Sequence, residues 1–134
     1  MYVVLSSLTK KYTTMFTIIN DLPDDILGIV VSGKVTKEDY DRINPVLEQH
    51  EQKYNEIKLF VDYQEFKWPT VNAMWEDLKV GFNYWGAIKA VAIVSKKEWL
   101  EDSADVMGTI MPGIKGEGFE PNERDKAISW LQEA

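Results

Sequence analysis

The chain has 134 residues, 45% of them hydrophobic and 28% charged, which is enough for one globular domain with its own core. It contains no cysteine, and this excludes a disulfide framework, a thiol nucleophile and a thiolate metal site. The net charge of −7 argues against nucleic acid as a partner, because such binding depends on clustered Lys and Arg side chains. The first residues do not have the pattern of a secretory signal, and no apolar run is long enough to span a bilayer, so we expect a cytoplasmic protein.

The first predicted elements are two strands joined by a turn. Residues 15–20, "MFTIIN", are rich in β-forming side chains, and residues 26–33, "ILGIVVSG", form an almost continuous apolar run. Between them, residues 21–25 read Asp-Leu-Pro-Asp-Asp, which is typical of a turn. We therefore expect an antiparallel pair of strands over residues 15–33.

A helix is predicted next, followed by a third strand. Thr36 is a suitable N-cap, and Asp39 three residues later completes a loose capping box. Apolar residues then recur at helical spacing to about residue 54, and Pro45 is expected to kink the helix. Residues 57–63, "IKLFVDY", have the composition of a buried strand.

The second half of the chain alternates between helices and strands. An amphipathic helix is predicted over residues 70–85, because apolar residues repeat there at 4-3-4-3 spacing. A buried strand at 87–95 and a second helix at 96–110 follow. A Gly-interrupted strand at 114–120 and a last helix, capped by Asn122, complete the chain.

The predicted order of elements is β-β-α-β-α-β-α-β-α. Strands that alternate with helices favour right-handed crossovers and a mostly parallel sheet with helices on both faces. The fold class is therefore α/β, with a mixed, mostly parallel sheet in which the first strand is antiparallel.

With these elements in this order, the chain resembles the SpoIIAA-like branch of the STAS-domain fold, which is related in fold to the CRAL-TRIO lipid carriers. The residues behind the resemblance are "TIINDLPDDILGIVVSGKVTKEDYD", "WEDLK", "AVAIVSKKEWLE" and "MPG". They imply a single STAS/SpoIIAA-like domain over residues 15–134. Residues 1–14 are an N-terminal extension, which is either an added strand or a leader upstream of a start at Met15.

The chain departs from the signalling members of that fold at their phosphorylation site. Those members carry a serine in an Asp-Ser-Ser/Thr-Gly loop after the third strand. Asp62 keeps the acid at the end of the strand, but residues 64–70 read "QEFKWPT" and lack the motif. Thr70 is the nearest hydroxyl, and its simpler role is to cap the helix. A phosphoserine switch is therefore not expected.

No catalytic or metal-binding constellation is apparent. His50 is the only histidine, and one imidazole cannot form a histidine metal site. The glycines of "MPGIKGEG" match neither a phosphate-binding loop nor a dinucleotide fingerprint. We expect a protein that is not an enzyme, with no cofactor and no metal.

The stretch from residue 66 to residue 86 holds three of the five tryptophans of the chain. One face of a helix in this stretch is expected to be core, but the apolar sector is wider than one face requires. The helix at 96–110 is also rich in Trp and Met, and Met suits variable apolar surfaces. The candidate residues for a ligand or lipid surface, on these two helices and on the loop before the first, are Trp68, Met74, Trp75, Leu78, Phe82, Trp85, Trp99, Met107, Ile110 and Met111.

These features predict a non-catalytic binding domain in which the helices at 70–85 and 96–110 form a movable lid. The expected ligand is a nonpolar small molecule or a lipid, the class implied by the resemblance to CRAL-TRIO carriers. Lysines beside the tryptophans suit a membrane interface, but the net charge of −7 would be repelled by anionic lipid. Any contact with the inner face of the membrane is therefore expected to be weak and mainly hydrophobic. Two alternatives remain at this point: a protein-interaction module of the anti-sigma-factor-antagonist type without the serine switch, and a homo-oligomer that covers the same surface.

Overall fold

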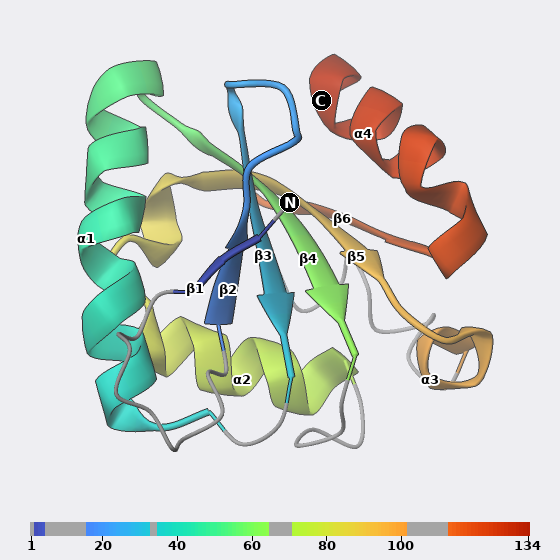
Figure 1. Ribbon diagram of the computed structural model, residues 1–134, viewed down its shortest axis with the longest axis horizontal. Coiled ribbons are helices and arrows are strands. Elements are labelled where there is room, and N and C mark those ends of the chain that lie inside the picture. Colours follow the sequence, from blue (N-terminus) through green and yellow to red (C-terminus); the bar gives the residue numbers. More distant parts are fainter. Residues whose placement is uncertain (1, 5–15, 33–34, 65–70, 102–112) are drawn as a thin grey trace.

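The computed structural model describes residues 2–4, 16–32, 35–64, 71–101 and 113–134 (Figure 1). The strands are β1 (Tyr2–Val4), β2 (Phe16–Ile19), β3 (Ile26–Val31), β4 (Ile57–Tyr63), β5 (Ile88–Val94) and β6 (Lys115–Phe119). The α-helices are α1 (Lys37–Tyr54), α2 (Val71–Gly81), α3 (Lys97–Glu101) and α4 (Arg124–Glu133), and two 3-10 helices are η1 (Trp85–Ala87) and η2 (Pro121–Glu123).

The strands form one sheet in the order β1-β2-β3-β4-β5-β6. Strands β1, β2 and β3 pair antiparallel, and β3 to β6 pair parallel. The predicted α/β class and the mostly parallel mixed sheet are confirmed. The segment 1–14 contributes β1, which pairs with β2 at one edge of the sheet.

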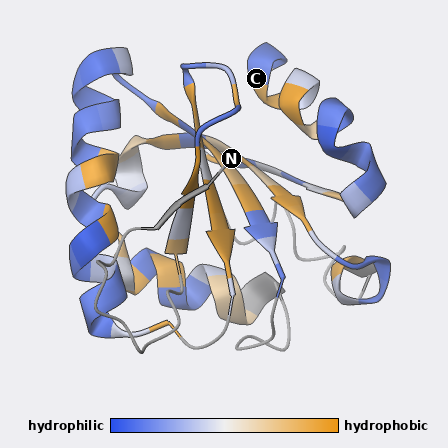
Figure 2. Cartoon of the chain, in the orientation of Figure 1, coloured by the Kyte–Doolittle hydropathy of each residue, from blue (hydrophilic) through white to orange (hydrophobic). Residues whose placement is uncertain are grey.

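Alternate residues of the strands point to the two faces of the sheet, and each face has its own core. Leu59 and Val61 of β4 face the side covered by α1 and α2, whereas Phe60 faces the side covered by α4. The central strands are buried on both faces, which explains why their sequences read as continuous apolar runs (Figure 2). Helices α1 and α2 thus lie on one face and α4 on the other (Figure 1).

The predicted capping box of α1 is confirmed. The Asp39 backbone N–H donates to Thr36 Oγ1 at 3.3 Å, and the Thr36 backbone N–H donates to Asp39 Oδ2 at 2.8 Å. Pro45 lies inside the helix, which nevertheless runs unbroken from Lys37 to Tyr54. The helix ends at Asn55, whose φ of 66° lies in the left-handed region that Asn tolerates better than most residues.

Two predicted boundaries differ from the structure, and the end of a third element cannot be compared with it. The helix expected over 70–85 ends at Gly81, and Trp85 belongs to η1. The helix expected over 96–110 is described as α3 only to Glu101, and its remainder lies outside the described residues. Asn122 lies within η2 and does not cap α4, because a reciprocal capping box between Glu120 and Glu123 begins the 3-10 turn instead.

Candidate functional site

The structure places most of the described candidate residues in the core. Met74, Trp75, Leu78, Phe82 and Trp99 are each at most 5% exposed, and Trp85 is half-buried. Trp68, Met107, Ile110 and Met111 lie outside the described residues. In this conformation the first five are therefore core residues, and their role at a ligand or lipid surface stays a prediction that requires their cover to move. An amphipathic helix buries its apolar stripe when a sheet is available to cover it.

Trp75 of α2, together with Phe82 and Trp85 just after that helix, belongs to an aromatic layer on the face of the sheet that α1 and α2 cover. We define this layer as Phe16, Tyr40, Trp75, Phe82 and Trp85. The ring centroids of Trp75 and Trp85 are 5.8 Å apart, and those of Phe16 and Phe82 are 6.2 Å apart. Tyr40 meets Phe82 edge to face at 5.8 Å. These are the separations at which aromatic rings attract one another.

The size of these side chains holds α2 away from the sheet. On the opposite face, several Cα atoms of α4 lie within 8 Å of Cα atoms in β5, where Ala90 and Ala92 leave room for close approach. Among the described residues, α2 approaches no strand so extensively. The space beneath α2 is thus filled by large apolar side chains, whereas the backbone of α4 lies close to the backbone of β5.

Two polar atoms are buried beside α2 at a cost to stability. Tyr40 Oη and Trp75 Nε1 meet no hydrogen-bond partner of good geometry among the described residues. Burial raises the pKa of Tyr40, and the nearby Asp77 carboxylate raises it further. A buried polar atom without a partner costs about 1–3 kcal/mol. The interface under α2 is therefore less favourable than its apolar area suggests.

Asn44 fixes the carboxyl end of α2 to α1. Its Nδ2 donates to the Gly81 carbonyl oxygen at 3.1 Å, and its Oδ1 accepts from the Asn83 backbone N–H at 2.9 Å. Asn44 is only 9% exposed, so both bonds are shielded from water. Sequence reasoning missed this residue, although it follows Ile43 on the buried side of the predicted helix. A polar side chain in that position was the available signal.

A groove of about 490 Å³ runs between α1 and the end of α2. Its lining includes Tyr40, Asn44, Asp77 and Asn83, together with Val80, whose side chain is 86% exposed. The groove therefore gives solvent a path to the junction of the two helices. This junction and the aromatic layer together form the candidate site.

Other chemistry finds little support in the described part of the chain. Those residues contain no group of three metal-ligating side chains and no helix with the length and apolarity to cross a membrane. His50 Nε2 lies 3.3 Å from the Asp25 carbonyl oxygen, and burial lowers its pKa. The histidine therefore makes a structural contact between α1 and the turn before β3.

Comparison with known proteins identifies the family. The model for the family described as SpoIIAA-like matches residues 26–132. The crystal structure of an uncharacterised protein of the DUF3478 family with a SpoIIAA-like fold, from Shewanella loihica PV-4, is 28% identical to the chain, with a TM-score of 0.63. That match covers 92% of this chain and 99% of the other. The comparison with curated proteins finds no match. The chain belongs to the SpoIIAA-like family of the STAS-domain fold.

Proposed function

We propose that this protein is a non-catalytic binding domain that takes up a nonpolar small molecule or a lipid beneath α2. The observation that carries the proposal is the aromatic layer, which separates α2 from the sheet by large side chains. A nonpolar ligand of similar size could occupy the same space if α2 moved outward. Movement would also hydrate Tyr40 Oη and Trp75 Nε1, which would offset part of its cost.

Asn44 is expected to hold α2 in the closed position. The hydrogen bonds from Asn44 hold the carboxyl end of α2 and the Asn83 backbone in place, while α1 itself is anchored in the core through Ile43 and Leu47. When these two bonds break, α2 can move outward and keep its own backbone hydrogen bonds. The closed form competes with the ligand for the same apolar side chains, so its stability limits the apparent affinity.

The test is the binding of Nile red, an uncharged apolar dye, to the wild-type protein and to Asn44→Ala. The substitution removes both bonds to the α2 end and should raise the population of the open form. We expect saturable binding at one site per chain, with an apparent Kd about tenfold lower in Asn44→Ala than in the wild type. The variant should also be less stable towards urea.

Leu131→Ala is the matched control, because Leu131 is fully buried under α4 on the opposite face. It should cost about 2–5 kcal/mol of stability and leave the affinity for the dye unchanged. Equal tightening in both variants would indicate general loosening of the fold and contradict the proposal. Failure of both wild type and Asn44→Ala to bind the dye would also contradict it.

A further inference from the structure

A second hollow lies on the other face of the sheet, at the carboxyl ends of the parallel strands. It has a volume of about 280 Å³ and is bordered by β4, β5 and the start of α4. We call it the strand-end pocket, and its lining includes Phe60, Asp62, Val94, Ser95, Lys96 and Arg124. Ligands of open α/β sheets commonly bind just outside the carboxyl ends of the strands.

Asp62 is an acid in an otherwise apolar row of this pocket. The register places it between Val30 of β3 and Val94 of β5, on the face covered by α4. Its side chain is half-buried, and this burial raises its pKa. Within the described residues it accepts one hydrogen bond, from Gln64 Nε2 at 3.3 Å, and forms no ion pair. A carboxylate in such a place has bonding capacity that the described residues do not use.

The other charged residue on this face of β4 has a clear structural role. Lys58 is buried, and its Nζ lies 3.5 Å from the Gln132 carbonyl oxygen, at the carboxyl end of α4. A cation is favoured there by the helix dipole. Asp62 lies towards the opposite end of α4, but no helix N–H bonds to it among the described residues. Lys58 is therefore bonded to the helix end that it faces, whereas no such bond is found for Asp62 in the ranges that the structure describes.

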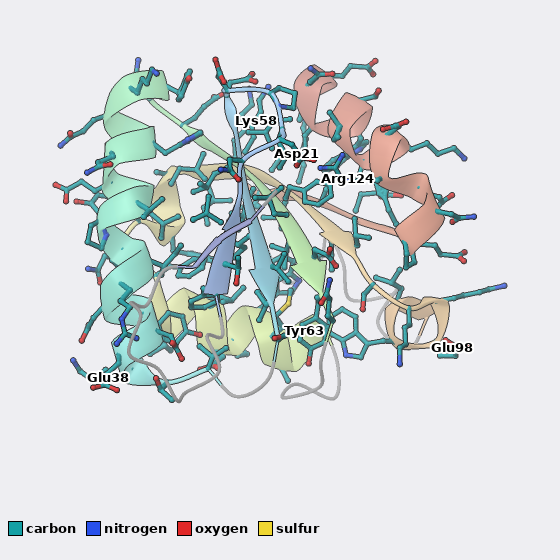
Figure 3. All side chains as sticks on the ribbon, in the orientation of Figure 1. Asp21, Glu38, Lys58, Tyr63, Glu98 and Arg124 are labelled. Atoms are coloured by element: carbon teal, nitrogen blue, oxygen red, sulfur yellow. The ribbon has the colours of Figure 1, made fainter. Side chains whose placement is uncertain are left out.

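The nearest arginine is held by another acid. Arg124 donates to Asp21 at 2.8 Å, and its guanidinium carbon lies 5.8 Å from the centroid of the Phe60 ring (Figure 3). The arginine is thus fixed at the wall of the pocket, where its charge opposes the rise in the pKa of Asp62, although the two side chains form no ion pair within the described part of the chain. A guanidinium has five N–H donors, so one bond to Asp21 leaves it able to meet a further acceptor.

The charges in the lining select the class of ligand. A simple anion would meet Asp62, and a simple cation would meet Lys96 and Arg124. A molecule that carries both charges satisfies both groups, and Phe60 and Val94 supply an apolar wall for the rest of it. We propose that the strand-end pocket binds a small zwitterion of amino-acid size, whose ammonium group pairs with Asp62 and whose carboxylate lies beside Lys96 and Arg124. This site is separate from the one beneath α2.

The experiment is an NMR titration of the full chain with L-leucine, L-leucine methyl ester and N-acetyl-L-leucine. The ester lacks the carboxylate, and the acetyl derivative lacks the ammonium group. We expect L-leucine to shift the backbone amides of Gln64 and Ser95 in a saturable manner, with a Kd of about 1 mM or lower. Both derivatives should bind about tenfold more weakly or worse, because the acetyl derivative offers Asp62 no ammonium group and the methyl ester offers Lys96 and Arg124 no carboxylate.

Three variants locate the effect. Asp62→Asn has almost the same shape and should weaken the binding of L-leucine about tenfold. Lys96→Gln should weaken the binding of L-leucine. It should not weaken the binding of the methyl ester, which has no carboxylate to interact with Lys96. Asp24→Asn is the control for Asp62→Asn, because it makes the same change of net charge at an exposed position in the turn before β3. It should bind L-leucine as the wild type does. A spectrum with unchanged dispersion confirms that each variant is folded.

The proposal is overturned if the methyl ester binds the wild type as tightly as L-leucine does. It is also overturned if the shifts of Gln64 and Ser95 persist unchanged in Asp62→Asn, or if no compound shifts them up to about 10 mM. None of these results depends on Nile red binding beneath α2, so the two proposals can fail separately.

Discussion

Gly81 shows how one residue sets the distance between α1 and α2. A Cβ added at this position would overlap the ring of Tyr40, which is itself buried against Phe16 and Phe82. Gly81→Ala should therefore lower the free energy of unfolding by about 1–3 kcal/mol, because the two helices must separate or the ring must leave its rotamer. Urea denaturation measures this difference.

Gly86 provides the comparison for that substitution. It lies in η1, and a Cβ built there meets no atom within 4 Å. Gly86→Ala should change the free energy of unfolding by less than about 1 kcal/mol, and in the stabilising direction, because Ala restricts the unfolded chain. Equal losses from the two substitutions would show that the Tyr40 contact does not limit the approach of α1 to α2.

At the scale of elements, α2 and α4 differ in how they are held on the sheet. Helix α4 packs closely on Ala90 and Ala92, whereas α2 rests on the aromatic layer and lies beside two buried polar atoms that meet no partner of good geometry among the described residues. Helices that move for function come from the less stable parts of a fold. Amides in the middle of α2 should therefore exchange hydrogen about tenfold faster than those in the middle of α4, even though both helices cover a core.

Hydrogen exchange followed by NMR under native conditions measures this difference. The helix length alone does not account for it, since α2 has 11 residues and α4 has 10. In Asn44→Ala, exchange should accelerate further in α2 and remain unchanged in α4. Matching protection of the two helices in the wild type would contradict a separate opening of α2.

The sequence predicted the strands and helices better than it predicted the contacts between segments that are distant in the sequence. The strands β3, β4 and β5 are visible as apolar runs because both of their faces are covered, and the capping box of α1 is a local signal. The end of α2 was predicted four residues too late. The Gly81 carbonyl oxygen and the Asn83 backbone N–H are both bonded by the side chain of Asn44. Asn44 is 37 residues away from Gly81 in the sequence, and a local pattern cannot reveal such a contact.

The same limit applies to the candidate sites. Helical spacing correctly grouped Trp75, Leu78 and Phe82 on one stripe, but it could not tell whether the stripe meets the sheet or a ligand. Asp62 was noticed only as the acid that remains from a missing motif. Its importance for the strand-end pocket depends on the register of β3, β4 and β5 and on the position of α4, which only the assembled sheet defines.

At the scale of the whole molecule, charge and aromatic content together determine how the protein should meet a membrane. The net charge of −7 opposes attraction to anionic lipid, so any contact must be mainly hydrophobic. Trp75 and Trp99 are buried in the described conformation and could reach lipid only if their cover moved. A lipid interface suits tryptophan, whose ring is apolar and whose N–H can stay hydrated. Lipid would then stabilise the open form, because the lipid and the core of the closed form compete for contact with the same apolar side chains.

Tryptophan emission in the presence of vesicles tests this last prediction. With neutral phosphatidylcholine vesicles we expect a blue shift that persists in high salt, since little electrostatic attraction exists to be screened. Trp75→Phe should lose part of the shift. Trp130→Phe should keep all of it, because Trp130 packs on Phe119 on the opposite face, with ring centroids 6.0 Å apart.

A shift that needs anionic vesicles and disappears in salt, or no shift with either kind of vesicle, would mean that the aromatic layer is a permanent part of the core. Binding to a membrane would then have to be abandoned, while uptake of a free nonpolar molecule beneath α2 would still be decided by the Nile red titration.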